Sequence, residues 1–277
     1  MINEIFPHRF SNQFVVASDV SNDDYVLHYQ NGSLLLKSHG DAYNLPRKSD
    51  LLPSFSISRK TFMFSLNDVR CFLVWNDTSY TGTNLSYVEV SLLRTLQPQE
   101  VAWVGVVGHQ LMEWYSQNRF CGKCGAPTHE KGDERAIACT SCSNVLYPKI
   151  SPAIIVAIVC NNKILLAHNS NFRNNWYSLV AGYVDVGESL EEAVAREVKE
   201  EVGLDVKNIR YYKSQPWPFS GSMMIGFTAE ADETQPVCPD NKEITSAEWF
   251  TRGNLPNHPP TISIAGELIE LFEQGKI

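Results

Sequence analysis

One stretch of the chain, residues 182–204 with the sequence GYVDVGESLEEAVAREVKEEVGL, constrains the fold more than any other. Its pattern predicts a helix that begins at a capping box, formed by Ser189 and Glu192, and that ends where Gly203 adopts the left-handed conformation. Valine recurs every four residues between these ends, at Val194, Val198 and Val202. We therefore expect an amphipathic helix with one buried face, preceded by a loop that contains glycine.

The same helix carries three glutamates, Glu197, Glu200 and Glu201, within an arc of about 100° beside the valine stripe. An ordinary solvated acidic face interleaves lysines four residues away from its glutamates, whereas Lys199 on this helix points elsewhere. Divalent cations such as Mg²⁺ or Mn²⁺ would turn the repulsion among the carboxylates into coordination. The helix pattern alone leaves two alternatives open, a solvated acidic face and a cation site.

Two cysteine pairs with the spacing C-x-x-C follow each other along the chain: Cys121 and Cys124, then Cys139 and Cys142. Four thiolates at this spacing predict one Zn²⁺ per chain, held tetrahedrally in a structural site because no coordination position stays open. Two disulfides or a redox pair are the alternatives, and both fit poorly in a protein expected to be cytoplasmic. The remaining cysteines are expected to be buried free thiols: Cys71, Cys160 and Cys238.

The composition argues against several classes of function. The 277 residues carry a formal net charge of −8, which speaks against a broad basic surface for DNA. The N-terminus shows no pattern of a signal peptide, and the longest apolar run, AIIVAIVC, is far shorter than the roughly 20 residues of a membrane helix. We therefore expect a cytoplasmic protein that binds neither DNA nor membranes.

The patterns along the chain predict three domains in a mixed α/β (α+β) class. Residues 1–117 are expected to form a β-rich domain, with strands at QFVVAS, SLLLKS, FMFSL and CFLVWN and an amphipathic helix over 97–119. Residues 118–148 would form the zinc module. Residues 149–277 are expected to form a mixed sheet, flanked by the glutamate helix and by a second amphipathic helix at TISIAGELIELFEQ.

The glutamate stretch resembles the Nudix box, G-x5-E-x7-R-E-U-x-E-E-x-G-U, in which U is aliphatic. It matches at every specified position: Gly182, Glu188, Arg196, Glu197, Val198, Glu200, Glu201, Gly203 and Leu204. The resemblance implies a Nudix α/β/α sandwich that hydrolyses a pyrophosphate bond with Mg²⁺ or Mn²⁺. Glu188 and Arg196 are expected to brace the loop by an ion pair. The implied catalytic metal site consists of the Ala181 carbonyl and of Glu197, Glu200, Glu201 and Glu243, with Glu200 as a ligand or the base.

A second motif, SQPWPF at residues 214–219, holds a tryptophan and a phenylalanine among prolines, so the segment is stiff and cannot be helical. Considered alone, these rings favour core packing over stacking on a flat ligand. The longer stretch SQPWPFSGS resembles a signature of the NADH pyrophosphatase branch of the Nudix hydrolases, from which Ser220 departs by replacing a proline. The resemblance implies these substrate-binding residues: Tyr147, Tyr183, Gln215, Pro216, Trp217, Pro218, Phe219, Ser220, Gly221, Ser222, Glu243 and Ala265.

Together the box, the zinc module and the arm imply an enzyme that splits NADH or NAD⁺ into nicotinamide mononucleotide and AMP. The resemblance also implies removal of NAD caps from RNA 5′ ends, and a homodimer. One alternative is a broader pyrophosphatase that acts on ADP-ribose or diadenosine polyphosphates. Another is a regulator without catalytic activity that binds NAD or RNA, although such a binder would not need every carboxylate of the box.

Overall fold

The computed structural model describes residues 1–16, 19–40, 42–170 and 175–277. The chain forms two compact units. The C-terminal unit consists of Ile150–Trp217 and Gly221–Ile277 together with Met1, and the N-terminal unit consists of Ile2–Lys149 together with the turn Pro218–Ser220. Each unit is described by itself.

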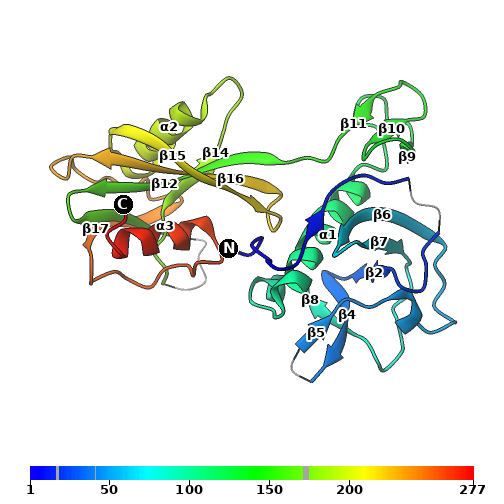
Figure 1. Ribbon diagram of the computed structural model, residues 1–277. Coiled ribbons are helices and arrows are strands. Elements are labelled where there is room, and N and C mark those ends of the chain that lie inside the picture. Colours follow the sequence, from blue (N-terminus) through cyan, green and yellow to red (C-terminus); the bar gives the residue numbers. More distant parts are fainter. Residues whose placement is uncertain (17–18, 41, 171–174) are drawn as a thin grey trace. The chain divides into compact units, whose positions relative to one another are not determined.

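The N-terminal unit is rich in short strands, as predicted (Figure 1). One sheet has the order β1-β6-β7-β2, and another has the order β3-β4-β5 with β8 paired to β4. The strands are β1 (Phe10–Ser11), β2 (Tyr25–Leu27), β3 (Tyr29–Gln30), β4 (Ser33–His39), β5 (Ala42–Asn44), β6 (Arg59–Leu66), β7 (Val69–Trp75) and β8 (Ser86–Glu89). The unit also contains two short 3-10 helices, η1 (Lys48–Asp50) and η2 (Val90–Arg94), and the long helix α1 (Gln99–Gln117).

Helix α1 packs closely because two of its interior positions are glycines. A Cβ atom at Gly105 would lie 2.8 Å from side-chain carbons of Leu34 and Leu93. One at Gly108 would lie 2.4 Å from the hydroxyl of Tyr29, which donates a hydrogen bond to the Gly105 carbonyl at 2.7 Å. The predicted helix is confirmed, although residues 101–106 are buried in succession and not on one face only. Small residues set its distance from the neighbouring side chains.

The strand predicted at QFVVAS is wrong over residues 13–16, and residues 17 and 18 lie outside the described part of the chain. Val15 and Val16 are 44% and 76% exposed. A run with β-branched residues becomes a strand only where a neighbouring strand and a core face receive it, and this segment has no ladder partner in the described residues.

A three-stranded antiparallel sheet with the order β11-β10-β9 lies in the segment of the two C-x-x-C pairs. Its strands are β9 (Thr128–Glu130), β10 (Ile137–Cys139) and β11 (Val145–Leu146). Within the N-terminal unit, Glu130 accepts hydrogen bonds from the side chains of Arg59 and Thr61 on β6, both at 3.0 Å. These contacts attach the small sheet to β6.

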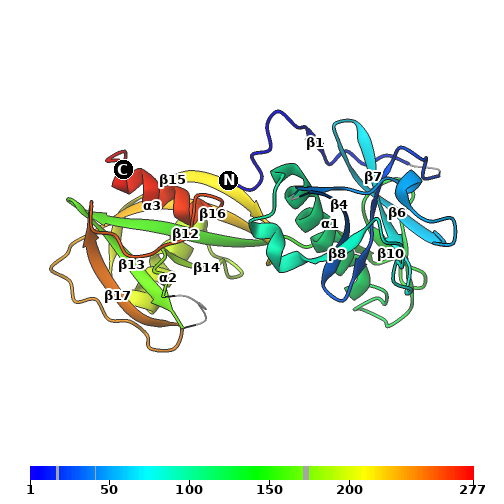
Figure 2. The same cartoon turned by 90° about the horizontal axis from the view of Figure 1, so that it is seen from below.

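The C-terminal unit is a mixed sheet with the order β15-β16-β12-β13-β17, to which β14 is added by pairing with β12 (Figures 1 and 2). Strand β12 runs parallel to β16 and antiparallel to β13 and β14. The elements are β12 (Ser151–Cys160), β13 (Lys163–Asn169), β14 (Val180–Tyr183), α2 (Leu190–Val202), β15 (Val206–Trp217), β16 (Ser222–Ala231), β17 (Ile244–Thr251) and α3 (Ile264–Glu273). A turn at Asn161 and Asn162 joins β12 and β13, with Asn161 at a φ of 53°.

The two helices cover opposite faces of this sheet (Figure 1). Alternate residues of β12, such as Ile154 and Val156, join the core cluster of α2, while Ile155 and Ala157 join that of α3. Successive side chains of a strand point to opposite faces, so β12 supplies both cores. The predicted three-layer α/β/α arrangement is confirmed.

Candidate active site

Helix α2 has the ends and the buried face that its sequence predicts. Ser189 and Glu192 form a capping box, and Gly203 ends the helix at a φ of 77°. The valine stripe is fully buried, at Val194, Val198 and Val202. Burying this stripe fixes the rotation of the helix, so the positions of its glutamates follow from the core.

Arg196 is the centre of a hydrogen-bonded network at the start of the site. Its Nε and Nη2 atoms donate to the two carboxylate oxygens of Glu188, and Nη2 also donates to the Tyr183 carbonyl at 3.0 Å. The ion pair lowers the pKa of Glu188 to about 2. The expected brace between Arg196 and Glu188 is confirmed. Less expected, Nη1 donates to Glu197 at 2.9 Å and to Glu200 at 3.2 Å.

The carboxylate of Glu197 lies directly over the backbone of Gly182. A Cβ atom at Gly182 would lie 2.0 Å from the Cδ atom of Glu197 and 2.1 Å from its Oε1 atom, so no larger residue fits without displacing the carboxylate. Gly182 follows Ala181 in β14. The first glycine of the motif thus brings the Glu197 carboxylate next to the strand that carries the Ala181 carbonyl.

Glu201 is the most unusual carboxylate of the site. Glu201 is 8% exposed, and its Oε2 atom has no hydrogen-bond partner in the described residues. Burial, together with the charges of Glu197 and Glu243, raises the pKa of Glu201 to about 8. Burial also raises the pKa of Glu197. A buried carboxylate oxygen without a partner is costly unless a proton or a cation satisfies it.

This donor set fits a divalent cation, because such ions are bound by carboxylate and carbonyl oxygens. In the part of the chain that the structure describes, however, only the four cysteines bring three or more ligand atoms within 4.8 Å of one another. The carboxylates of Glu197 and Glu200 are instead held by Arg196. Lys199 is engaged elsewhere, as expected, with Asp205 at 3.0 Å.

The loop before β17 contains a residue that sequence reasoning missed. The Asp240 carboxylate accepts the backbone N–H groups of Lys242, Glu243 and Ile244, the last at 2.8 Å. The Asp240 N–H donates to the carbonyl of Glu201 at 3.1 Å. Asp240 therefore connects the end of α2 to the segment that carries Glu243. The signal was an aspartate a few residues before a strand, which is common in turns and specific to no function.

A shallow pocket of about 350 Å³ lies beside the hydrogen-bonded network of Arg196. It is lined by Tyr183, Val184, Asp185, Arg196 and Glu200. The ring of Tyr183 is 54% exposed, and its hydroxyl lies 3.2 Å from Oγ of Ser222 on β16. An exposed ring, a guanidinium and a carboxylate thus share one concave surface.

The SQPWPF segment is the end of a strand and not a separate arm. In the ladder of β15 and β16, Pro216 is opposite Met223 and Trp217 is opposite Ser222. The hairpin turns at residues 218–221, where Gly221 has a φ of 65°. Trp217 and Phe219 are half-buried and Ser220 is exposed. The prediction that the segment is non-helical is confirmed, and its pairing with β16 adds to the constraint that the prolines impose.

Four predicted substrate residues are buried: Gln215, Pro218, Ser222 and Ala265. Two of them, Gln215 and Ala265, have their side chains in the interior of the C-terminal unit. Gln215 is fully buried, and its amide bonds to the backbone of Ile262 and Ile264. Ala265, in the first turn of α3, is 5% exposed and belongs to the α3 core cluster. Direct contact of either side chain with a substrate does not fit this packing.

In the N-terminal unit, Tyr147 is 60% exposed, and its hydroxyl donates to Glu134 at 3.3 Å. Within the same unit the guanidinium of Arg94, at the end of η2, lies 4.7 Å from the centre of the Phe219 ring. Sequence reasoning did not predict this contact, because the two residues are far apart in the chain.

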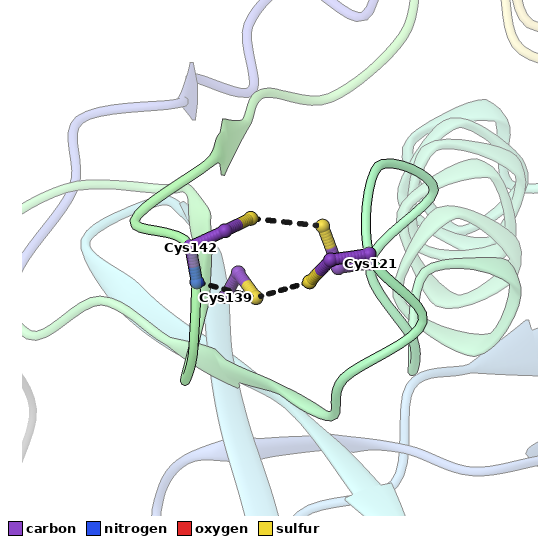
Figure 3. Close-up of side chains that lie close together, drawn as sticks. Cys121, Cys139 and Cys142 are labelled. Atoms are coloured by element: carbon purple, nitrogen blue, oxygen red, sulfur yellow. Dashed lines mark hydrogen bonds between the residues drawn. The ribbon is translucent and has the colours of Figure 1, made fainter.

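The four cysteine sulfurs gather as predicted (Figure 3). Sγ of Cys121 lies 3.7 Å from that of Cys142, and Sγ of Cys124 lies 3.4 Å from that of Cys139. Both separations exceed the roughly 2 Å of a disulfide, and all four are free thiols. Backbone N–H groups donate to the sulfurs of Cys121 and Cys139 and lower the pKa of both thiols. At these two positions the thiolate, the form that binds zinc, is favoured, whereas the neighbouring sulfurs of Cys139 and Cys142 raise the pKa of Cys124.

The three other cysteines follow the prediction only in part. Cys71 is buried, Cys160 is partly exposed and Cys238 is exposed. In space, Cys238 lies next to the end of α2, where its N–H donates to the Val202 carbonyl at 2.9 Å. In the described residues no helix combines the length and the apolar character needed to cross a membrane.

Comparison with known proteins identifies two domains. The family model of the NUDIX domain matches residues 149–272, and that of the NADH pyrophosphatase zinc ribbon domain matches residues 116–147. The chain is 48% identical over 163 residues to proteins named NAD-capped RNA hydrolase NudC from Klebsiella pneumoniae (strain 342) and Salmonella typhi. These matches cover 59% of this chain and 63% of each relative, which is less than two thirds of the relatives' length.

A crystal structure of a NUDIX hydrolase from Nitrosomonas europaea resembles the chain with a TM-score of 0.50 and 19% sequence identity. The match covers 57% of this chain and 92% of that one. At this level of identity the likeness supports the fold and nothing further.

Proposed function

Because this chain belongs to the Nudix hydrolase family and carries the zinc ribbon of the NADH pyrophosphatases, we propose that it hydrolyses the pyrophosphate bond of NADH and NAD⁺. The products are nicotinamide mononucleotide, in its reduced or oxidised form, and AMP. An NAD cap at the 5′ end of an RNA contains the same pyrophosphate linkage between its two nucleotides, and the relatives are named for that substrate. The proposal therefore includes removal of NAD caps from RNA 5′ ends.

The observation that carries the proposal is the state of Glu201. A carboxylate with a pKa of about 8 and an unpartnered buried oxygen is destabilising in an ordinary helix. It is accounted for if a divalent cation replaces the proton when the site is loaded. The simpler alternative, a solvated acidic face, would leave all the glutamates in contact with water. Glu201 is buried, so it does not fit this alternative.

The residues of the site have distinct proposed roles. Glu197 and Glu201 hold Mg²⁺ or Mn²⁺, together with the Ala181 carbonyl and Glu243. When bound, such a cation neutralises phosphate oxygens and lowers the pKa of water. Glu200 is exposed and within reach of Arg196, so it can accept a proton from water or serve as a further ligand.

The substrate's rings require a different surface. Tyr183 presents an exposed ring at the pocket, and Trp217 presents a half-buried ring at the end of β15. Rings held by a β-ladder and prolines stack on a flat ligand with little loss of entropy. We assign Tyr183 and Trp217 to the rings of the dinucleotide, and residues 218–222 to hydrogen bonds with it.

The zinc ribbon, the oligomeric state and the location complete the proposal. The Cys₄ cluster holds one structural Zn²⁺, whose removal unfolds the ribbon. By resemblance to its relatives, the chain is proposed to form a homodimer in the cytoplasm. Sedimentation equilibrium of the purified protein tests the dimer.

A substrate panel with product identification tests the function. NADH, NAD⁺, NAD-capped RNA, ADP-ribose and a diadenosine polyphosphate are incubated with Mg²⁺ or Mn²⁺, and products are separated by chromatography. We expect the highest kcat/KM on NADH, NAD⁺ or NAD-capped RNA. Preference for ADP-ribose or the diadenosine compound would favour the broader pyrophosphatase, and binding of NAD without turnover would favour a regulator.

A further inference from the structure

A buried glutamine occupies a place where the structure leaves no room for a substrate. Gln215 lies in β15, opposite Met224 of β16, and its residue is 0% exposed. The amide Nε2 donates to the carbonyl of Ile262 at 2.9 Å, and Oε1 accepts the N–H of Ile264 at 2.7 Å. Both polar ends of the side chain are therefore used on the backbone of one short segment.

That segment is the beginning of helix α3. Ile264 is the first residue of the helix, and its N–H is one of the donors that the helix itself cannot satisfy. Ser263 is the N-cap and accepts the N–H of Gly266 at 3.3 Å. Gln215 thus caps the same helix turn from a strand 49 residues away in sequence, while Ser263 caps it locally.

The loop around this turn has little freedom to move. A Cβ atom at Gly266 would lie 2.1 Å from the carbonyl oxygen of Pro260 and 2.5 Å from that of Pro259. The N–H of Ser263 donates to the same Pro260 carbonyl at 3.3 Å. The two hydrogen bonds of Gln215 then hold the backbone of this turn next to β15.

We propose that Gln215 is a positioning residue, which fixes the first turn of α3, including Ala265, against the strand that leads into Trp217. The inference rests on the proposed function, because Trp217 is assigned to the substrate there. It changes the role expected for Gln215 from hydrogen bonding with the substrate to holding the first turn of α3 in register with the strand that leads into Trp217. Preorganisation of this kind improves binding because fewer groups must be ordered when the ligand arrives.

The test replaces Gln215 by methionine, which has a similar length and no hydrogen-bonding amide. Hydrogen exchange of the Ile264 amide is followed by NMR, and the affinity for NADH is measured by NADH fluorescence without added divalent cation. We expect Ile264 to exchange at least tenfold faster in Gln215→Met and the Kd for NADH to rise about tenfold. If Gln215→Met does not fold, Gln215→Asn, which keeps the amide but is too short for both contacts, is measured in the same way.

Glu267 provides a matched control on the same helix. It accepts a hydrogen bond from Lys213 at 3.0 Å and one from the hydroxyl of Tyr212, so it also ties the first turn of α3 to β15, but through its own side chain and not through the backbone N–H of Ile264. Glu267→Ala should leave the exchange of Ile264 and the Kd for NADH within about twofold of the original protein. An equal effect of Glu267→Ala and Gln215→Met would show that any tether suffices and would overturn the proposal.

Two results contradict the proposal directly. Unchanged exchange of Ile264 with weaker NADH binding would mean that Gln215 contacts the substrate. Faster exchange with unchanged NADH affinity would mean that the tether is merely structural. Failure of the proposed function looks different, because NADH would then bind but remain uncleaved when Mg²⁺ is added.

Discussion

Glu201 and Gly182 show how single residues of this site depend on their surroundings. Glu201 combines deep burial with neighbouring carboxylates, and both effects favour its protonated form. Gly182 leaves the space that the Glu197 carboxylate fills. Neither property is visible in the residue itself. Each arises because the valine stripe fixes the rotation of α2 and places both glutamates against the sheet.

Replacing Glu201 by glutamine should stabilise the metal-free protein at alkaline pH. The folded-state pKa of about 8 lies above the ordinary 4.5, so the folded protein binds this proton more tightly than the unfolded chain does. The free energy of unfolding of the metal-free protein therefore falls as the pH rises from about 4.5 to about 8. Glu201→Gln removes this ionisation, and we expect a gain of roughly 1–3 kcal/mol at pH 8 in the presence of a chelator.

Urea unfolding at pH 5 and pH 8 measures this effect. The two proteins should differ much less at pH 5 than at pH 8, and added Mg²⁺ should stabilise only the protein with Glu201. A Glu201→Gln protein that is less stable than the original at pH 8 without metal would show that the carboxylate is not strained by burial.

Replacing Gly182 by alanine should damage catalysis more than stability. The added Cβ would meet the Glu197 carboxylate at 2.0 Å, so the carboxylate must move away from the strand. A displacement of about 1 Å at a reacting centre can cost about a hundredfold in rate, which is the loss of kcat on NADH that we expect. Gly132→Ala is the control, because a Cβ at Gly132 meets no atom of the described residues within 4 Å. Normal turnover by Gly182→Ala would show that the position of the Glu197 carboxylate does not matter for the reaction.

Among the elements, those with local signals could be predicted and those built by distant contacts could not. Helix α2 was predicted with both ends because its cap, stripe and terminal glycine all lie within the helix or beside it. The extension of β15 to Trp217 was missed, since prolines argue against a ladder and only the pairing with β16 shows one. The anchoring of α3 by Gln215 was also missed, because hydrogen bonds between distant residues leave no pattern in a sequence.

Removing the ring of Trp217 distinguishes a stacking surface from a core. The residue is half-buried, so Trp217→Ala should change the melting temperature little, whereas kcat/KM on NADH should fall by about one to two decades. ADP-ribose, which has no nicotinamide, should be affected less. Tyr211→Ala removes a ring from the same strand, 61% exposed and outside the SQPWPF segment, and serves as the control. A large fall in melting temperature with equal losses on both substrates would show that Trp217 is a core residue.

The whole molecule combines the C-terminal unit, which carries the glutamates of α2, with the N-terminal unit, which contains the cluster of four cysteines. The family patterns and the cysteine spacing predicted the order of these parts, because each part has its own sequence signal. The short strands of the N-terminal unit carry weaker signals. There the sequence predicted a β-rich domain, but not which runs would find a partner, as residues 13–16 show.

Loss of one cysteine ligand should unfold the ribbon and leave the C-terminal unit folded. Protein purified without added metal should contain about one zinc per chain, and Cys124→Ser should contain little. Limited proteolysis should then cut Cys124→Ser within residues 116–149. Cys238→Ser, which changes an exposed cysteine of the other unit, should keep its zinc and resist the protease. A folded, zinc-free protein with an unchanged melting temperature would rule out a structural zinc.

Hydrolysis of NADH with Mg²⁺, compared between the original protein and Glu201→Gln, tests the proposed chemistry most directly. We predict equal amounts of reduced nicotinamide mononucleotide and AMP from the original protein, dependence on the divalent cation, and a kcat lower by orders of magnitude for folded Glu201→Gln. The opposite result would be equal turnover by both proteins, or no cleavage of NADH or any other dinucleotide by folded, zinc-loaded protein with Mg²⁺ or Mn²⁺. Either outcome would contradict a cation-dependent pyrophosphatase built on the glutamates of α2.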